Sequence, residues 1–321
     1  LFWGEIRQYK VMASIATGIL TLLLATLWFV LLSRLRWKVR LIGLALLIVG
    51  VLGITRLVEI RGVTGDLRPI LSWKGGRAEV QRSDGTAAPV AVPPSDHDFP
   101  QFLGPSRNAV IDGVRLARDW DAEPPRELWR TEVGDGWASF AVWGALAVTQ
   151  EQKGGRELVV AYDLPTGAVR WEHAYDARFD TTIGGIGPRA TPAIAGDRVY
   201  TMGATGLLHA LDLRTGEVVW SRDLIDGYGG ELPEWGKSCS PLLVDGLVVV
   251  SAGGPNGASL VAFERETGEE VWRGGDDRSS YSSPLVATLA GVRQIVILNG
   301  EIVTGHDPAD GSVLWSYPWS G

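Results

Sequence analysis

The chain has 321 residues, of which 45% are hydrophobic and 21% charged, and it contains 41 Gly, 14 Trp, 2 Met and 1 Cys. A single cysteine excludes a disulfide-stapled domain, a zinc site built from several cysteines and a c-type haem attachment motif within this sequence. Many glycines, together with more Trp than Phe or Tyr, favour a β-rich repeat protein with tight turns over a helical one.

Charge and hydropathy divide the chain into two parts. Residues 1–95 carry 12 Lys+Arg and 5 Asp+Glu, whereas residues 96–321 carry 18 and 32, so the second part is acidic. Because nucleic-acid binding needs a basic surface, we expect no nucleic-acid partner. The basic part is also the hydrophobic part, which indicates a membrane region.

Residues 1–58 are predicted to form this membrane region, with two transmembrane helices at about residues 11–33 and 40–58. Residues 11–32 contain no charge, and residues 41–55 form a second uncharged run. A helix of about 22 residues is roughly 33 Å long, enough to cross a hydrocarbon core of about 30 Å. The second run is short for a span, so a buried or interfacial helix is the alternative there.

The loop between the two runs contains four cations, Arg34, Arg36, Lys38 and Arg40. By the positive-inside rule this loop lies in the cytoplasm, so a hairpin places the following residues on the far side of the membrane. The expected location is therefore the bacterial inner membrane, with lipid as a partner and the acidic part facing the periplasm. Residues 59–97 include a Pro-rich stretch and are predicted to be a linker.

Four segments of the acidic part align without gaps, and each ends in a tryptophan. They are AYDLPTGAVRW, ALDLRTGEVVW, AFERETGEEVW and GHDPADGSVLW, which end at Trp171, Trp220, Trp272 and Trp315. Trp129 marks the end of a preceding copy, and the steps between successive tryptophans are 42, 49, 52 and 43 residues. A repeat of about 40–50 residues with strand-like composition is typical of a propeller blade of four antiparallel strands.

Within each copy, a turn of the D-x-x-T-G type joins the third and fourth strands. The acidic side chain accepts hydrogen bonds from its own turn, and the glycine supplies a positive φ. The tryptophan of the fourth strand is predicted to be the apolar anchor between neighbouring blades. The turn glycines predicted to take part in this docking are Gly167, Gly216, Gly268 and Gly311.

The A-x-D-x-x-T-G-x-x-x-W pattern resembles the pyrroloquinoline quinone (PQQ)-like β-propeller repeat family. The resemblance covers residues 98–321, and the opening DFPQFLGPSRNAV is similar to that of an uncharacterised membrane-anchored bacterial subgroup, with Phe99 and Leu103 in place of a Trp and an Arg. It implies an all-β propeller of seven or eight blades. We therefore expect an N-terminal fragment with about four blades, preceded by an α-helical transmembrane hairpin.

The predicted ligand-binding surface is formed by the long loops that join the fourth strand of one blade to the first strand of the next. These loops emerge on one face of a propeller, where clustered aromatic and charged residues form a binding surface. Solvated connectors without a ligand are the alternative. The residues predicted to line this loop face are Arg189, Tyr228, Trp235, Lys237 and Tyr281.

No catalytic or metal-ligating set is predicted, because the four histidines are dispersed and the acidic turn residues lie on a ring. The resemblance to quinoprotein dehydrogenases implies an adjacent cysteine pair over the cofactor, and Cys239 has no such neighbour. These observations favour a non-catalytic binding or scaffold module with a periplasmic protein or polymer as ligand. The alternative is a PQQ-dependent alcohol or sugar dehydrogenase-like oxidoreductase, whose PQQ and Ca²⁺ only the resemblance implies.

Overall fold

A computed structural model describes residues 2–63, 68–74 and 92–319 of the protein. The chain divides into two compact units. One comprises Leu1–Arg82 and Thr181–Gly185, and the other comprises Ser83–Asp180 and Ile186–Gly321.

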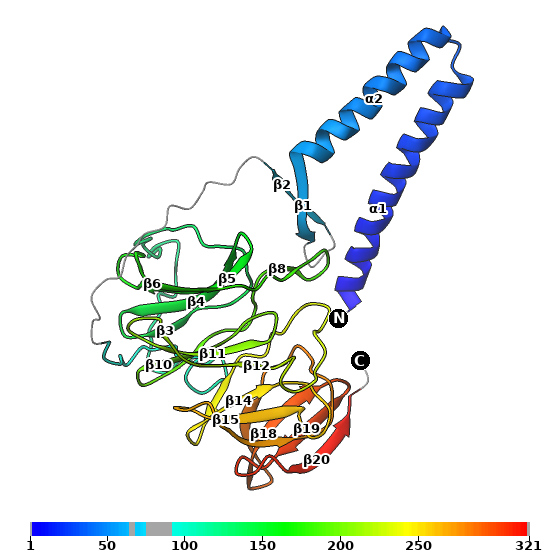
Figure 1. The fold of residues 1–321 in the computed structure, drawn as a ribbon. Coiled ribbons are helices and arrows are strands. Elements are labelled where there is room, and N and C mark those ends of the chain that lie inside the picture. The colour runs from blue at the N-terminus through cyan, green and yellow to red at the C-terminus, as the bar shows by residue number, and fades with distance from the viewer. Residues whose placement is uncertain (1, 64–67, 75–91, 320–321) are drawn as a thin grey trace. The chain divides into compact units, whose positions relative to one another are not determined.

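The first unit begins with a helical hairpin (Figure 1), made of α1 (Phe2–Leu27) with a π-helical end η1 (Trp28–Leu32), and α2 (Trp37–Leu57). The stretches Lys10–Leu32 and Trp37–Leu57 are each long and apolar enough to cross a membrane, and no part of their most apolar windows is buried inside the protein. A helix that is apolar on all sides and uncovered is suited to a lipid environment.

Arg40 closes the C-terminal end of the first helix. Its guanidinium donates to the carbonyl oxygens of Val30 and Leu35, at 3.0 Å each, and to that of Ser33. The last carbonyls of a helix lack intrahelical partners, so a cation that binds them stabilises the helix end. Lys38 and Arg40, which the sequence places in the loop, belong to the first turn of α2, and Arg40 has a structural role there.

A short antiparallel hairpin of β1 (Val58–Val63) and β2 (Pro69–Trp73) follows α2 directly. Except for Val58, it lies inside the range 59–97 that the sequence predicts to be a linker, so the start of that range has regular structure. Residues 64–67 and 75–91 of the predicted linker lie outside the described residues.

The second unit contains four antiparallel sheets of four strands each, and in every sheet the strands lie side by side in chain order. Figure 1 shows them following one another along the chain from green to red. The all-β fold of four-stranded units after a helical hairpin is thereby confirmed. Sheet 1 comprises β3 (Ala141–Trp143), β4 (Leu146–Lys153), β5 (Arg156–Asp163) and β6 (Val169–Tyr175), and sheet 2 comprises β9 (Ala193–Ala195), β10 (Arg198–Met202), β11 (Leu207–Asp212) and β12 (Val218–Asp223).

Sheets 3 and 4 repeat this arrangement. A small hairpin, β7 (Asp180–Thr181) with β8 (Gly185–Ile186), interrupts the loop between β6 and β9. Sheet 3 comprises β13 (Leu242–Val244), β14 (Leu247–Ser251), β15 (Leu260–Glu264) and β16 (Glu270–Gly274), and sheet 4 comprises β17 (Leu285–Leu289), β18 (Val292–Asn299), β19 (Ile302–His306) and β20 (Val313–Pro318).

The repeated turn between the third and fourth strands has the expected hydrogen bonds. Asp212 accepts the N–H groups of Arg214 (2.9 Å) and Thr215 (3.1 Å), and Gly216 has a φ of +73°. Glu264, at the equivalent position of sheet 3, accepts the two equivalent bonds at 2.8 and 2.6 Å. The longer glutamate therefore replaces aspartate without loss of these bonds.

Successive sheets are joined by one recurring tryptophan contact. The indole N–H of Trp171 in sheet 1 donates to the carbonyl oxygen of Leu213 in sheet 2 at 2.8 Å, and a Cβ on Gly216 would lie 2.5 Å from the indole ring. The indole thus fits against a turn that only glycine leaves open. The other contacts of this kind are Trp129 to Leu164 and Gly167, Trp220 to Arg265 and Gly268, and Trp272 to Pro308 and Gly311.

The first strands of sheets 1, 2 and 3 approach one another, in a region here called the hub. β3 approaches β9, and β9 in turn approaches β13. Each of these strands pairs with only one neighbour in its own sheet, so its second edge faces the hub.

Candidate functional site

Residues 98–109, here called the hub strap, cover the inner edges of the first two sheets. Phe99 and Val142 of β3 exchange two backbone hydrogen bonds, at 3.0 and 2.8 Å. The carbonyl oxygen of Pro100 accepts the N–H of Ile194 in β9 at 2.7 Å. Unpaired strand edges attract other strands or ligands, and here the chain's own segment satisfies them.

Side-chain hydrogen bonds hold both ends of the strap against the sheets. At one end, Asp98 accepts the backbone N–H of Gly144 at 2.6 Å, in the turn that follows β3. At the other end, Arg107 donates to the carbonyl oxygens of Pro241 (2.9 Å) and Ser240 (3.3 Å), directly before β13. Arg107 is 8% exposed, and burial lowers its pKa to about 10. The strap therefore reaches three successive sheets.

The backbone of the strap is locally strained. Leu103, Arg107 and Ala109 have φ values of 60°, 51° and 59°, a left-handed region that costs a non-glycine residue about 1–2 kcal/mol. Internal bonds hold this shape, including the N–H of Ala109 to the carbonyl of Leu103 at 2.9 Å. The sequence offers no periodic signal for such a segment, and only the resemblance of its opening drew attention to it.

Trp235 and Tyr281 form an exposed aromatic pair on the loop face. Their rings stack with centroids 5.2 Å apart and planes at 24°. The Tyr281 hydroxyl accepts the backbone N–H of Trp235 at 3.4 Å. Trp235 comes from the loop before β13 and Tyr281 from the loop before β17. Each is 45% exposed, so the pair presents an apolar surface to solvent.

Arg189 belongs to the same region. Its guanidinium lies over the ring of Phe179, 5.0 Å from the centroid, and donates to the carbonyl oxygen of Gly187 at 3.0 Å. Burial lowers the pKa of Arg189, and the nearby Glu157 carboxylate acts in the opposite direction. The structure thus brings three of the predicted loop-face residues, Arg189, Trp235 and Tyr281, into one neighbourhood.

The other two predicted residues lie elsewhere. Lys237 is 1% exposed, and its ammonium donates to the carbonyl of Ala252 (2.5 Å) and the hydroxyl of Ser279 (2.9 Å). Burial lowers the pKa of Lys237 to about 8. These bonds connect the loop before β13, which carries Lys237, to the end of β14 and to the loop before β17. Tyr228 instead packs on sheet 3, where its hydroxyl donates to the Glu270 carboxylate at 2.8 Å.

Glu157, at the start of β5, is a buried carboxylate that the sequence reasoning missed. It is fully buried and accepts the hydroxyl of Tyr175 (2.9 Å) and the N–H of Ala204 (3.2 Å). Burial raises its pKa, and Arg189 partly opposes that shift. The equivalent positions of sheets 2, 3 and 4 hold Gly206, Ala258 and Glu301, so the repeat pattern alone does not single out Glu157.

Two histidines meet between sheets 1 and 2. The ring centroids of His173 and His209 are 5.3 Å apart, and Tyr175 lies 4.5 Å from His209. Burial, reinforced by His173, lowers the pKa of His209 to about 4, so this imidazole is neutral near pH 7. Among the described residues, no group of three or more His, Cys, Asp and Glu side chains is placed to hold a metal ion.

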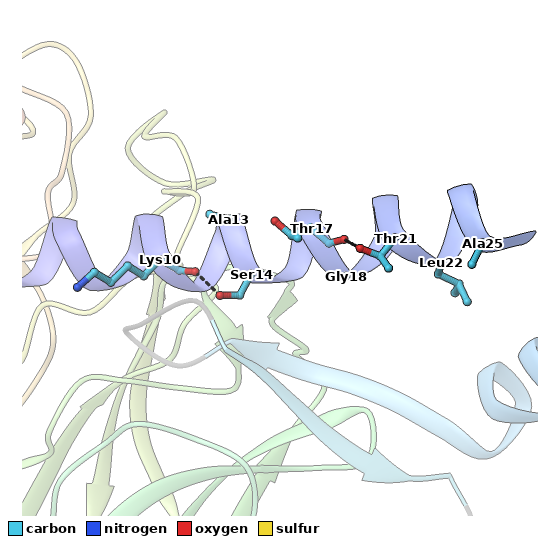
Figure 2. A pocket seen from close by; sticks show the side chains of 8 residues that line it. All are labelled: Lys10, Ala13, Ser14, Thr17, Gly18, Thr21, Leu22 and Ala25. Atoms are coloured by element: carbon cyan, nitrogen blue, oxygen red, sulfur yellow. Dashed lines mark hydrogen bonds between the residues drawn. The ribbon is translucent and has the colours of Figure 1, made fainter. Parts of the chain in front are cut away.

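A shallow hollow also runs along one side of α1 (Figure 2). Figure 2 shows the hydroxyls of Ser14 and Thr21 turned back onto the helix, where they donate to the carbonyls of Lys10 and Thr17 at 2.7 Å each. Small side chains on one helix leave this hollow, which is typical of faces that pack against another helix in a membrane.

The comparisons agree on the repeat. The family model described as "Outer membrane protein assembly factor BamB" matches residues 155–321. The chain is 25% identical to a tetrathionate hydrolase of Acidithiobacillus ferrooxidans (51% of this chain, 33% of the relative), 26% to the quinoprotein alcohol dehydrogenase PedH of Pseudomonas putida (41% and 23%), and 34% to the assembly factor BamB of Xanthomonas campestris (28% and 22%).

The aligned part of the chain spans no more than about a third of any of these three relatives. Among solved structures, a europium-containing methanol dehydrogenase is similar at a TM-score of 0.42 and 15% identity, over 59% of this chain and 43% of that one. These relatives include both enzymes and an assembly factor.

Proposed function

Because the chain belongs to the PQQ-like repeat propeller family whose model is described as outer membrane protein assembly factor BamB, we propose that it is a membrane-anchored, non-catalytic binding module. Its ligand is a protein, held on the loop face around Arg189, Trp235 and Tyr281. The observation that carries this proposal is the hub strap, because it occupies the inner strand edges that line the axis. The relative named BamB, an assembly factor, supports a protein partner.

The alternative is a quinoprotein dehydrogenase-like oxidoreductase, which the similarity to PedH favours. PQQ is a planar quinone with three carboxylates, and it needs an open axial space and a divalent cation with anionic ligands. The described residues do not fit this group at the hub, since the strap pairs with β3 and β9 and Arg107 covers the start of β13. In the part of the chain that the structure describes, no group of three or more His, Cys, Asp and Glu side chains is placed to hold such a cation.

The loop face has the composition of a protein-binding surface. Stacked aromatic rings supply a large apolar area with little loss of side-chain entropy, and a neighbouring arginine adds directional hydrogen bonds. Beneath them, the buried Lys237 fixes the loops, so the surface is formed before a partner arrives. A pre-formed surface loses less conformational entropy of its loops and side chains when a partner binds.

The membrane anchor rests on the two N-terminal helices. Both are long and apolar enough to span a bilayer, and four cations lie between them or in the first turn of the second helix. Under the positive-inside rule, the sheets then face the periplasm of a bacterium from its inner membrane. Fusions of alkaline phosphatase after residue 63 and within the 33–36 loop test this: activity is expected only for the first, and the reverse result contradicts the orientation.

Site-specific photo-crosslinking in cells tests the binding role. A photoreactive residue in place of Tyr281 in the full chain is expected to give one discrete adduct with a second protein. The matched control is Trp120, which is 56% exposed and lies outside the loop face. The adduct should disappear in Arg189→Ala and Trp235→Ala variants whose thermal unfolding is unchanged.

A separate experiment tests the alternative function as a PQQ-dependent oxidoreductase. The purified full chain in detergent is titrated with PQQ and CaCl₂, and quinone absorbance and dye reduction with alcohols or sugars are recorded. We expect neither a stoichiometric complex nor turnover. A bound quinone with turnover, or equal adducts from Tyr281 and Trp120, contradicts the proposal.

A further inference from the structure

The hairpin of β1 and β2 has an uncovered apolar face. The register pairs Val58 with Trp73. It also pairs Ile60 with Leu71, two residues further along, so both pairs lie on the same face, because strand side chains alternate. Ile60, Leu71 and Trp73 are 61%, 63% and 69% exposed. Three large apolar side chains therefore share one face of this hairpin and point away from the rest of the described chain.

A hairpin of this kind needs support from a neighbouring surface. Its sheet contains only two of the described strands, so each strand has one edge that pairs with no other described strand. A two-stranded hairpin is marginally stable in water unless its apolar face packs against something. We therefore expect the face of Ile60, Leu71 and Trp73 to be in contact with an apolar partner.

The near end of the hairpin is continuous with the second apolar helix. β1 begins at Val58, directly after Leu57, the last residue of α2 (Figure 1). After β2, Lys74 donates its backbone N–H to the carbonyl oxygen of Leu57 and its ammonium to that of Thr55, at 2.8 Å each. The last carbonyls of a helix lack intrahelical partners, so these bonds both complete the end of α2 and hold the hairpin there.

The far end of the hairpin lies beside the start of the first apolar helix. Arg68 and Pro69, at the beginning of β2, line one shallow groove together with Lys10 and Ser14 of α1. The apolar stretch of α1 begins at Lys10, and that of α2 ends at Leu57. Both ends of the hairpin therefore lie where the two helices would leave the hydrocarbon core of a membrane.

We infer that the β1–β2 hairpin lies in the headgroup layer of the membrane, with Ile60, Leu71 and Trp73 in contact with the acyl chains. This inference rests on the proposed membrane anchor. A deeper position is excluded by the open strand edges, since hydrocarbon leaves their backbone groups without hydrogen-bond partners. Tryptophan is enriched in this layer of membrane proteins, which agrees with the place of Trp73. The bilayer is the occupant because the hairpin continues a helix that is itself apolar on all sides.

Depth-dependent fluorescence quenching tests this with the full chain in lipid vesicles. A cysteine labelled with the environment-sensitive dye NBD replaces Leu71, and the vesicles contain a nitroxide lipid labelled either near the headgroup or at the end of the acyl chain. Cys239 is 1% exposed, so the unaltered chain is the blank for labelling. An interfacial apolar face is buried about 5–10 Å into the boundary of headgroups and acyl chains. We therefore expect the shallow nitroxide to quench most of the Leu71→Cys emission and the deep nitroxide to quench little.

Two control labels separate this inference from the anchor on which it rests. Leu46→Cys, inside α2, should be quenched by the deep nitroxide, and Asp176→Cys, whose native side chain is 94% exposed in the second unit, by neither. A quenched Leu46→Cys label with an unquenched, water-accessible Leu71→Cys label overturns the inference and leaves the anchor intact. A Leu71→Cys label that aqueous iodide cannot reach and neither nitroxide quenches means that protein covers the face, which also overturns it. An unquenched Leu46→Cys label contradicts the anchor and the inference together.

Discussion

Trp171 and Gly216 lie in different sheets, yet the indole of the first occupies the space that a side chain on the second would fill, 2.5 Å from the position of its Cβ. The indole N–H completes the contact by donating to Leu213 at 2.8 Å. The same pair recurs along the chain. A tryptophan in the fourth strand of one sheet therefore packs on a glycine in a turn of the next sheet at each of these interfaces.

Removal of a docked indole should be far more costly than removal of the undocked one. Trp171→Ala loses a buried ring and its hydrogen bond, so we expect the free energy of unfolding to fall by about 3–5 kcal/mol. Trp315→Ala should change it by less than about 1 kcal/mol, since Trp315 is partly exposed and docks on no described turn. Urea unfolding of both variants measures this, and equal losses would refute it.

The turn glycine can be tested against an equivalent glycine in open space. Gly216 (φ +73°) faces Trp171, whereas Gly291 (φ +81°) has nothing within 4 Å of its Cβ position. Alanine at either site carries the left-handed strain of about 1–2 kcal/mol. Gly216→Ala should cost about 1–3 kcal/mol more than Gly291→Ala, because the methyl group displaces the indole. Similar losses for the two variants contradict the docking role of this glycine.

The fold should lose stability in mild acid through His209. Its folded pKa of about 4 lies below the unfolded value of about 6.5, so folding favours the neutral ring. Its contribution is complete above pH 6.5 and is lost as the pH falls toward 4, by about 3 kcal/mol in total. His209→Gln should flatten the dependence of the unfolding midpoint on pH between 6.5 and 4. His97→Gln, at an exposed site, should leave that dependence unchanged; a wild-type slope in His209→Gln would refute the assignment.

The parts of the fold that rest on local repetition were predictable. The tryptophan spacing and the D-x-x-T-G turns predict the four-stranded sheets, and the uncharged runs predict the two helices, because these patterns reflect contacts that repeat. The hairpin of β1 and β2 was not foreseen in the predicted linker.

The candidate site was less predictable because it depends on contacts between distant segments. Loop position alone grouped Lys237 and Tyr228 with Trp235 and Tyr281, but the ammonium of Lys237 turns inward to Ala252 and the hydroxyl of Tyr228 turns to Glu270. The hub strap depends on Arg107 meeting carbonyls more than 130 residues away, which no local pattern encodes.

Amide hydrogen exchange tests most directly whether the strap occupies the hub. The N–H groups of Val142 and Ile194 donate to Phe99 and Pro100 of the strap, whereas Leu243 and Val286 hold the positions equivalent to Ile194 in sheets 3 and 4. We expect slow exchange at Val142 and Ile194 in the full chain, faster exchange at Leu243 and Val286, and no change on addition of PQQ and CaCl₂. Arg107→Ala should speed exchange at Ile194, and Arg115→Ala, at an exposed site, should not. Fast exchange of Val142 and Ile194 in the unaltered chain, or protection of Leu243 and Val286 that appears only with PQQ, would contradict the account.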